Sequence, residues 1–93
     1  MFFAIDVGNT NIKIGIFDGK KLITTFRMNS QIVHTTDEYG LMLKQIPEVQ
    51  DIDLTKIEGA IISSVVPKVM ESLHNAIVKY FGIKPIIVGP GIK

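Results

Sequence analysis

A polar turn near the start of the chain combines residue types that suit phosphate binding. Residues 6–13 read Asp-Val-Gly-Asn-Thr-Asn-Ile-Lys. Gly8 has no side chain, so a phosphate can approach the backbone, and the N–H groups of such a turn can form an anion-binding concavity. Asp6 would repel phosphate directly, but its carboxylate can hold a hydrated Mg²⁺ that bridges phosphate oxygens. Further donors from side chains are Asn9, Thr10, Asn11 and Lys13.

The same residues also suit an ordinary hairpin. Asn, Gly and Thr are common in turns, and an Asp that follows a strand often forms an Asx turn. The motif alone therefore leaves the two interpretations open. The position of the turn in the predicted fold decides between them.

Three strands are predicted to surround this turn. The apolar run at residues 2–7 predicts a strand buried on both faces. Alternation predicts a second strand at residues 12–17, and Asp18-Gly19 predicts a hairpin turn. A third strand is expected at residues 21–28. Its side chains predicted to share one face are Leu22, Thr24, Phe26 and Met28.

Two helices and two further strands are predicted in the rest of the chain. Thr35 and Glu38 form a capping-box pattern, so a helix is expected to begin there and to end at Pro47. Residues 48–56 read as a polar connector, followed by a strand centred on residues 60–62 and a small polar loop. Pro67 is expected to begin the second helix and Gly82 to end it. The apolar faces of these helices are predicted to comprise Tyr39, Met42, Leu43 and Ile46 in the first, and Met70, Leu73, Ile77, Tyr80 and Phe81 in the second. A last strand is expected at residues 85–88, stopped by Gly89-Pro90-Gly91.

The predicted order is β-β-β-α-β-α-β in one domain over residues 1–93. A meander followed by two helix–strand crossovers gives an α/β mixed sheet with covering helices. This is the ribonuclease-H-like, or actin-like ATPase, layout. That fold places its first phosphate loop between the first two strands, which favours phosphate binding at the turn from Asp6 to Asn11.

Composition excludes several classes of function. The chain is 46% hydrophobic and 20% charged, with a net charge of +1 and no cysteine. These values indicate a globular domain, exclude disulfides, and give no basic patch for nucleic acid. The sequence shows no signal peptide and no apolar run long enough to cross a membrane. We therefore expect a cytoplasmic protein with no nucleic-acid or membrane partner.

Four stretches carry a resemblance to a known family. The stretches are Ile5-Asp6-Val7-Gly8-Asn9-Thr10-Asn11, Phe26-Arg27, Thr36-Asp37-Glu38-Tyr39-Gly40 and Ser63-Ser64-Val65-Val66-Pro67. With them the chain resembles the N-terminal half of a type III pantothenate kinase, of the Bvg accessory factor family in the acetate kinase–Hsp70–actin superfamily. They run in family order through nearly the whole chain, and the last makes the match specific.

The resemblance implies ATP-dependent phosphorylation of pantothenate, the first step of coenzyme A biosynthesis. It implies Mg²⁺ and a monovalent cation (K⁺ or NH₄⁺) as cofactors, and a homodimer. It also implies that Asp6 helps to hold the metal. The residues that the resemblance assigns to ATP binding are Asp6, Val7, Gly8, Asn9, Thr10, Asn11, Ile12 and Lys13.

The resemblance also implies that part of the enzyme lies beyond this sequence. The family's catalytic carboxylate, in a Gly-x-Asp-Arg motif, its pantothenate-binding residues and its second phosphate loop come after the position of Lys93. We therefore assign no catalytic residue. The 93 residues alone are expected to be inactive, to bind ATP weakly, and to expose an apolar surface that favours self-association.

Two other functions fit the same fold. A non-enzymatic nucleotide-sensing or partner-binding module would use the same turn, since fold does not fix function. Another phosphotransferase, such as a sugar kinase, is a third possibility. The Ser-Ser-Val-Val-Pro stretch at residues 63–67 argues against that third interpretation.

Several other polar residues have a structural explanation. Ser63 and Ser64 lack the elbow motif and base of a serine nucleophile, so we expect them to line the cleft or to order the second helix. His34 and His74 lack a companion at metal-ligand spacing and are expected to have surface or packing roles.

Charged residues outside the turn give weaker signals. Arg27 suits either a carboxylate partner or a subunit contact, and the sequence does not decide. Asp37 and Glu38 suit the positive end of a helix dipole. The connector carboxylates lack an EF-hand pattern and are expected to form a solvated link; they are Glu48, Asp51 and Asp53.

Overall fold

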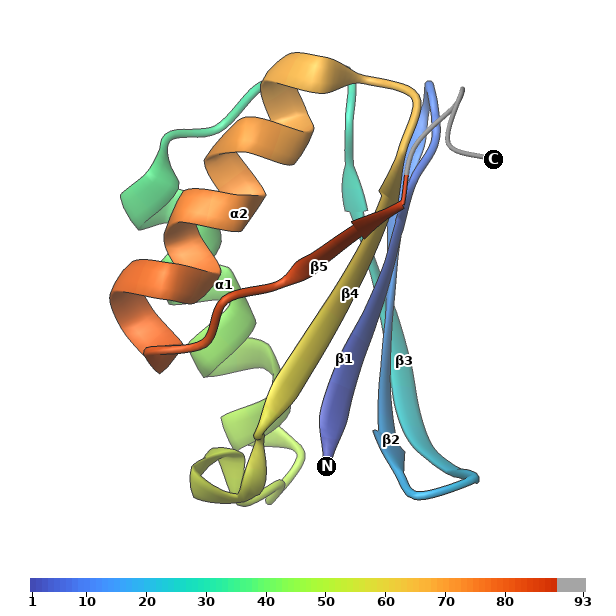
Figure 1. Ribbon diagram of the computed structural model, residues 1–93, viewed down its shortest axis with the longest axis vertical. Helices are drawn as coiled ribbons and strands as arrows, with labels where there is room; N and C mark the ends of the chain where they lie inside the picture. Colours follow the sequence, from blue (N-terminus) through green and yellow to red (C-terminus); the bar gives the residue numbers. More distant parts are fainter. Residues whose placement is uncertain (89–93) are drawn as a thin grey trace.

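The computed structural model describes residues 1–88, which form a five-stranded mixed sheet with two helices on one side (Figure 1). The strands are β1 (Phe2–Val7), β2 (Asn11–Asp18), β3 (Lys21–Asn29), β4 (Gly59–Ser64) and β5 (Ile86–Val88). The helices are α1 (Thr36–Val49), α2 (Pro67–Phe81) and a short 3₁₀ turn, η1 (Leu54–Lys56). The strand order is β3-β2-β1-β4-β5, with β1 antiparallel to β2 and parallel to β4. The predicted β-β-β-α-β-α-β order is confirmed.

The core lies between the sheet and the two helices. Alternate residues of β1 and β2 point to this side, and the pairs Phe3–Ile16, Ile5–Ile14 and Val7–Ile12 are all buried. The helices contribute Tyr39, Leu43, Leu73 and Ile77, each fully buried. We call this side of the sheet the covered face.

The prediction that the first strand is buried on both faces is wrong. Phe2 and Ala4 are only half-buried and Asp6 is exposed, because no helix within residues 1–88 lies over their side of the sheet. Both crossovers, β3-α1-β4 and β4-α2-β5, advance in the same direction across the sheet. Connections of one hand then place both helices on the same face.

We call the opposite side the open face. Strand register assigns its members, which are Phe2, Ala4, Asp6, Lys13, Gly15, Phe17, Leu22, Thr25, Arg27, Ile61, Ser63, Ile86 and Val88.

The open face includes Leu22, which the sequence placed with Thr24, Phe26 and Met28. A register shift between Ile16 and Phe17 pairs Phe17 with Leu22, although Ile16 pairs with Thr24. One extra residue in a strand moves everything beyond it to the other face. The prediction holds for Thr24, Phe26 and Met28 and is wrong for Leu22.

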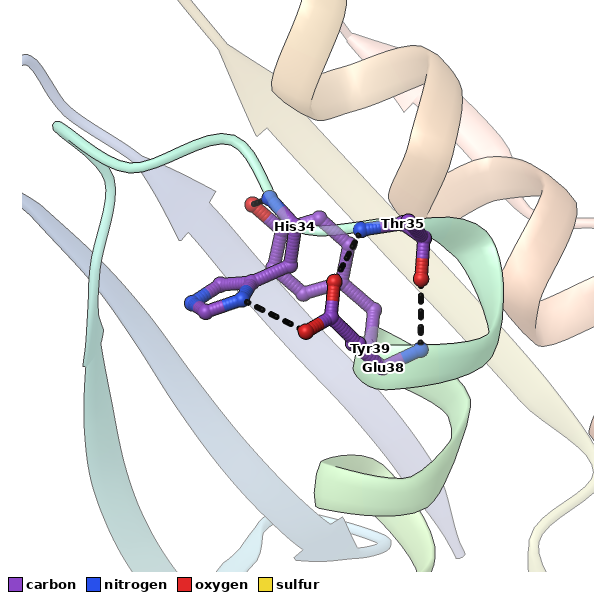
Figure 2. Close-up of polar contacts among 4 residues, drawn as sticks. All are labelled: His34, Thr35, Glu38 and Tyr39. Atoms are coloured by element: carbon purple, nitrogen blue, oxygen red, sulfur yellow. Dashed lines mark hydrogen bonds and ion pairs between the residues drawn. The ribbon is translucent and has the colours of Figure 1, made fainter.

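Helix α1 begins as the sequence predicts. Figure 2 shows Thr35 Oγ1 accepting from the Glu38 backbone N–H at 3.1 Å, while Glu38 Oε1 accepts from the Thr35 N–H at 2.8 Å. The expected end at Pro47 is wrong, because the helix continues to Val49 with the ring of Pro47 buried. Proline near a helix end loses only one hydrogen bond, and its carbonyl still accepts from Gln50 at 3.0 Å.

The second half of the chain matches the predictions with small changes. The polar connector contains η1, which Asp53 caps by accepting from the Thr55 N–H at 3.0 Å. Helix α2 begins at Pro67 and ends at Gly82, whose φ of 65° is the left-handed conformation that glycine favours. The predicted stop at Gly89-Pro90-Gly91 lies outside the described residues. Within residues 1–88, no helix is long and apolar enough to cross a membrane.

Candidate phosphate-binding site

The carboxyl ends of β1 and β4 lie side by side at the centre of the sheet. From β1 the chain turns toward β2 on one side, whereas from β4 it passes through α2 toward β5 on the other side. Such a change of direction between neighbouring parallel strands is a topological switch point, and ligands of open α/β sheets bind in the crevice there. The Val65 N–H donates to the Val7 carbonyl at 3.2 Å and fixes the two strand ends together.

A row of polar side chains crosses the open face at this switch point. Asp6 pairs in register with Lys13 of β2 and with Ser63 of β4, and Lys13 pairs in turn with Arg27 of β3. All four are exposed. We call Arg27, Lys13, Asp6 and Ser63 the polar row. It places two cations, a carboxylate and a hydroxyl on adjacent strands, about 5 Å apart from strand to strand.

A shallow hollow lies beneath the polar row. It has a volume of about 420 Å³, and its lining is Ala4, Ile5, Asp6, Lys13, Gly15, Phe17, Leu22, Thr25, Ile61 and Ser63. At the end of the hollow away from the polar row, the Phe2 and Phe17 rings stack with their centroids 5.4 Å apart. The open face is therefore polar near the carboxyl ends of β1, β3 and β4 and the start of β2, and mainly apolar toward the Phe2–Phe17 pair.

The turn at residues 8–11 connects β1 to β2 one residue pair beyond Asp6 and Lys13. Asn9, Thr10 and Asn11 are exposed, as a phosphate contact would require. The Gly8 N–H is not free for a ligand, because it donates to the Asn11 carbonyl at 2.9 Å and closes the turn. The predicted cluster of N–H groups therefore starts at Asn9.

Gly8 is not required by the backbone of the turn. A Cβ built at this position would meet only the Asn11 carbonyl oxygen, at 3.4 Å, which is an ordinary contact. The fold itself therefore tolerates a side chain there. The close approach of a ligand remains a physical reason for glycine.

The turn is also held from the side of β3 by a residue that the sequence did not indicate. Ser30 is 4% exposed; its N–H donates to the Thr10 carbonyl at 3.1 Å and its Oγ to the Gly8 carbonyl at 2.7 Å. Nothing in a lone serine after a strand reveals such contacts. Only the β2–β3 register, which pairs Asn11 with Asn29, brings Ser30 beside the turn.

The other predicted site residues separate into two groups. Val7 and Ile12 are buried in the core, so only their backbone faces the turn. Ser63 and Ser64 are the last residues of β4 rather than part of a loop. Ser63 belongs to the polar row, whereas Ser64 is buried and its Oγ accepts from the Val66 N–H at 2.9 Å, at the start of α2. Ser63 therefore lines the hollow, whereas Ser64 orders the start of the second helix.

The histidines and the remaining carboxylates lie away from the polar row. The His34 ring packs edge-to-face on the Tyr39 ring (Figure 2). The His74 ring contacts the neighbouring Asn75 side chain.

The Asp37 carboxylate accepts hydrogen bonds from the Lys79 ammonium, at 2.8 Å, and from the Tyr80 hydroxyl. These hydrogen bonds lower the pKa of Asp37. Asp37 therefore joins α1 to α2, which the sequence did not indicate. No group of three or more acidic or histidine residues that could hold a metal exists within residues 1–88.

Comparisons with known proteins agree with this architecture. A family model described as type III pantothenate kinase matches residues 2–93. Proteins named type III pantothenate kinase from Agathobacter rectalis and Bifidobacterium animalis subsp. lactis are 48% and 47% identical over all 93 residues. The chain spans 36% and 37% of their lengths, so the expected half is nearer a third.

Solved structures show the same fold at low sequence identity. A putative N-acetylglucosamine kinase from Porphyromonas gingivalis has a TM-score of 0.65 and 15% identity, covering 96% of this chain and 34% of that one. RuvC of T. thermophilus, in complex with a Holliday junction substrate, has a TM-score of 0.56 and 20% identity, covering 96% of this chain and 64% of that one. These likenesses confirm the ribonuclease-H-like fold.

Proposed function

This chain belongs to the type III pantothenate kinase family, and from that premise we propose that it supplies the ATP-phosphate-binding part of an enzyme that phosphorylates pantothenate to 4'-phosphopantothenate. One observation carries the proposal. The exposed turn at residues 8–11 stands at the switch point of the sheet, with Asp6 and Lys13 adjacent on the open face below it.

Each part of the turn has a proposed role. The ammonium of Lys13 and the short side chains of Asn9, Thr10 and Asn11 bind phosphate oxygens. Gly8 lets the phosphate approach, while Val7 and Ile12 contribute backbone only, because their side chains are in the core. Positioning and charge stabilisation dominate phosphoryl transfer, and this site supplies both.

The residues present fit Mg²⁺ in the form that kinases use it. Mg²⁺ keeps several waters and is held by one or two carboxylates together with substrate phosphates. Asp6 offers one exposed carboxylate beside Lys13, so it suits this role although residues 1–88 hold no larger acidic cluster. When bound, the ion neutralises charge on the phosphate oxygens.

Further features are proposed from the family resemblance. They are a monovalent cation (K⁺ or NH₄⁺), a homodimer, a cytoplasmic location, and the absence of nucleic-acid and membrane partners. The assay that checks the cation is activity in K⁺ compared with Na⁺ at equal ionic strength. Light scattering checks the dimer.

A chimeric enzyme tests the proposed function. Residues 1–93 would replace the matching part of the Agathobacter rectalis protein, with which they are 48% identical. The chimera should phosphorylate pantothenate with ATP, and Asp6→Asn should lower kcat by about a hundredfold or more. Asp18→Asn is the control, since Asp18 is an exposed residue at the other end of β2.

Two results would contradict the proposal. One is full turnover by the Asp6→Asn chimera. The other is a chimera that folds but transfers no phosphate to pantothenate, while the unmodified Agathobacter rectalis protein does.

A further inference from the structure

We infer that Ser30 is a positioning residue that sets the turn at residues 8–11 for phosphate binding. The inference rests on the proposed function, because it concerns the same turn. Ser30 itself does not line the hollow below the polar row, so it acts through the backbone of the turn.

The sheet register brings Ser30 to the turn. Asn11 and Asn29 form the last pair of the β2–β3 ladder, and Ser30 is the next residue along the chain. Its N–H donates to the Thr10 carbonyl at 3.1 Å, which extends the ladder by one bond. Ser30 therefore stays beside the turn without depending on its own side chain.

The hydroxyl of Ser30 adds a second restraint. Its Oγ donates to the Gly8 carbonyl at 2.7 Å, between residues 22 positions apart in the chain. Ser30 is 4% exposed and Gly8 is half-buried, so the bond is partly shielded from water. Removing the hydroxyl of Ser30 costs free energy, because the Gly8 carbonyl loses its partner where water replaces it only in part.

The two bonds decide which groups the turn offers to an anion. Carbonyl oxygens repel phosphate, whereas N–H groups attract it. With the carbonyls of Gly8 and Thr10 turned toward Ser30, they are held away from the phosphate. Donors that are already oriented bind a developing charge without the cost of reorganisation.

A second buried serine provides a matched control. Ser64 is 8% exposed, and its hydroxyl also makes two hydrogen bonds, both to the backbone of Val66 at 2.9 and 3.0 Å. These bonds order the start of α2 and do not involve residues 8–11. Removing either hydroxyl should reduce stability, but only the loss at Ser30 should change nucleotide binding.

The test measures steady-state kinetics of the chimeric kinase. Ser30→Ala should raise KM for ATP by roughly tenfold and leave KM for pantothenate within about twofold, since only the phosphate turn is released. Ser30→Thr keeps the hydroxyl and should return KM for ATP to within about threefold of the unmodified value. Ser64→Ala should lower Tm while KM for ATP stays within about twofold.

Each alternative result has a distinct meaning. If Ser30→Ala lowers Tm but leaves KM for ATP unchanged, Ser30 is merely structural and the inference is overturned, whereas loss of turnover in Asp6→Asn would still uphold the proposed function. Should Ser30→Ala fail to fold, Ser30→Cys keeps the shape with a weaker donor and should show the same rise in KM. If the chimera is inactive, the Kd of the 93-residue chain for MgATP decides, and equal values with and without Ser30→Ala overturn the inference.

Discussion

The two faces of the sheet carry different chemistry. The covered face is mainly apolar and packs against α1 and α2, and its buried Ser64 hydrogen-bonds to the start of α2, so its side chains serve stability. The open face is mainly apolar around Phe2 and Phe17 but carries the polar row, near the carboxyl ends of β1, β3 and β4 and the start of β2. Charges gathered on one face, at the switch point, add nothing to the core. Their position suits the phosphate site proposed above.

Adjacent phenylalanines give the largest expected difference between the faces. Phe3 is fully buried on the covered face and packs edge-to-face on Phe81, whereas Phe2 is half-buried on the open face and stacks on Phe17. Phe3→Ala should lower the free energy of unfolding by about 3–5 kcal/mol. Phe2→Ala should cost only about 1 kcal/mol, for the lost aromatic pair. Urea denaturation measures both, and equal losses would contradict the comparison.

The contact between the helices should give the next largest effect. A Cβ at Gly40 of α1 would lie 2.2 Å from the ring of Tyr80 of α2, so Gly40→Ala must displace that ring and its bond to Asp37. We expect a loss of about 1–2 kcal/mol in thermal unfolding, even though alanine favours helix. In a Tyr80→Ala background the same change should cost nothing. A cost that persists there would show that Tyr80 is not the obstacle.

Gly8→Ala should separate stability from binding. The added methyl group makes only an ordinary contact, so the free energy of unfolding should change by less than about 0.5 kcal/mol. Binding of MgATP should weaken clearly, because the methyl group stands where a phosphate would approach. Calorimetry against the unmodified chain checks this. Unchanged affinity would mean that phosphate does not approach the backbone at Gly8.

The smallest expected effect is a pH dependence at the helix contact. Hydrogen bonds from Lys79 and Tyr80 lower the pKa of Asp37 below its ordinary value of 3.8. A lowered pKa gives stability that is present above 3.8 and is lost as pH falls through the folded-state value. The difference in Tm between the unmodified chain and Asp37→Asn should therefore be full at neutral pH and shrink in acid. A difference that grows in acid would contradict this sign.

The sequence predicted elements well where the signal is local. The capping box at Thr35, the hairpin at Gly19 and the end of α2 at Gly82 depend on neighbours in the chain, and all three were found. Leu22 was misplaced, because a register shift is a property of two strands together. Burial of β1 on both faces was a wrong prediction, because it depends on where the crossovers place the helices.

The candidate site was predicted in part for the same reason. The residue types of Asp6 and Lys13 indicate a phosphate site, and the structure places both on adjacent strands of one face. Ser30 could not be found from the sequence, since it meets Gly8 across 22 positions through the β2–β3 ladder. The direct roles of these residues toward nucleotide stay predictions.

Titration of the ¹⁵N-labelled 93-residue chain with MgATP tests whether the open face binds nucleotide phosphate. Weak binding is expected, in the range that NMR follows well. We expect amide shifts at residues 6–13, with smaller changes at Ser30 and Ser63, and little change along the exposed sides of α1 and α2. Shifts centred on the helices, or none at millimolar nucleotide, would contradict the assignment of the open face as the phosphate site.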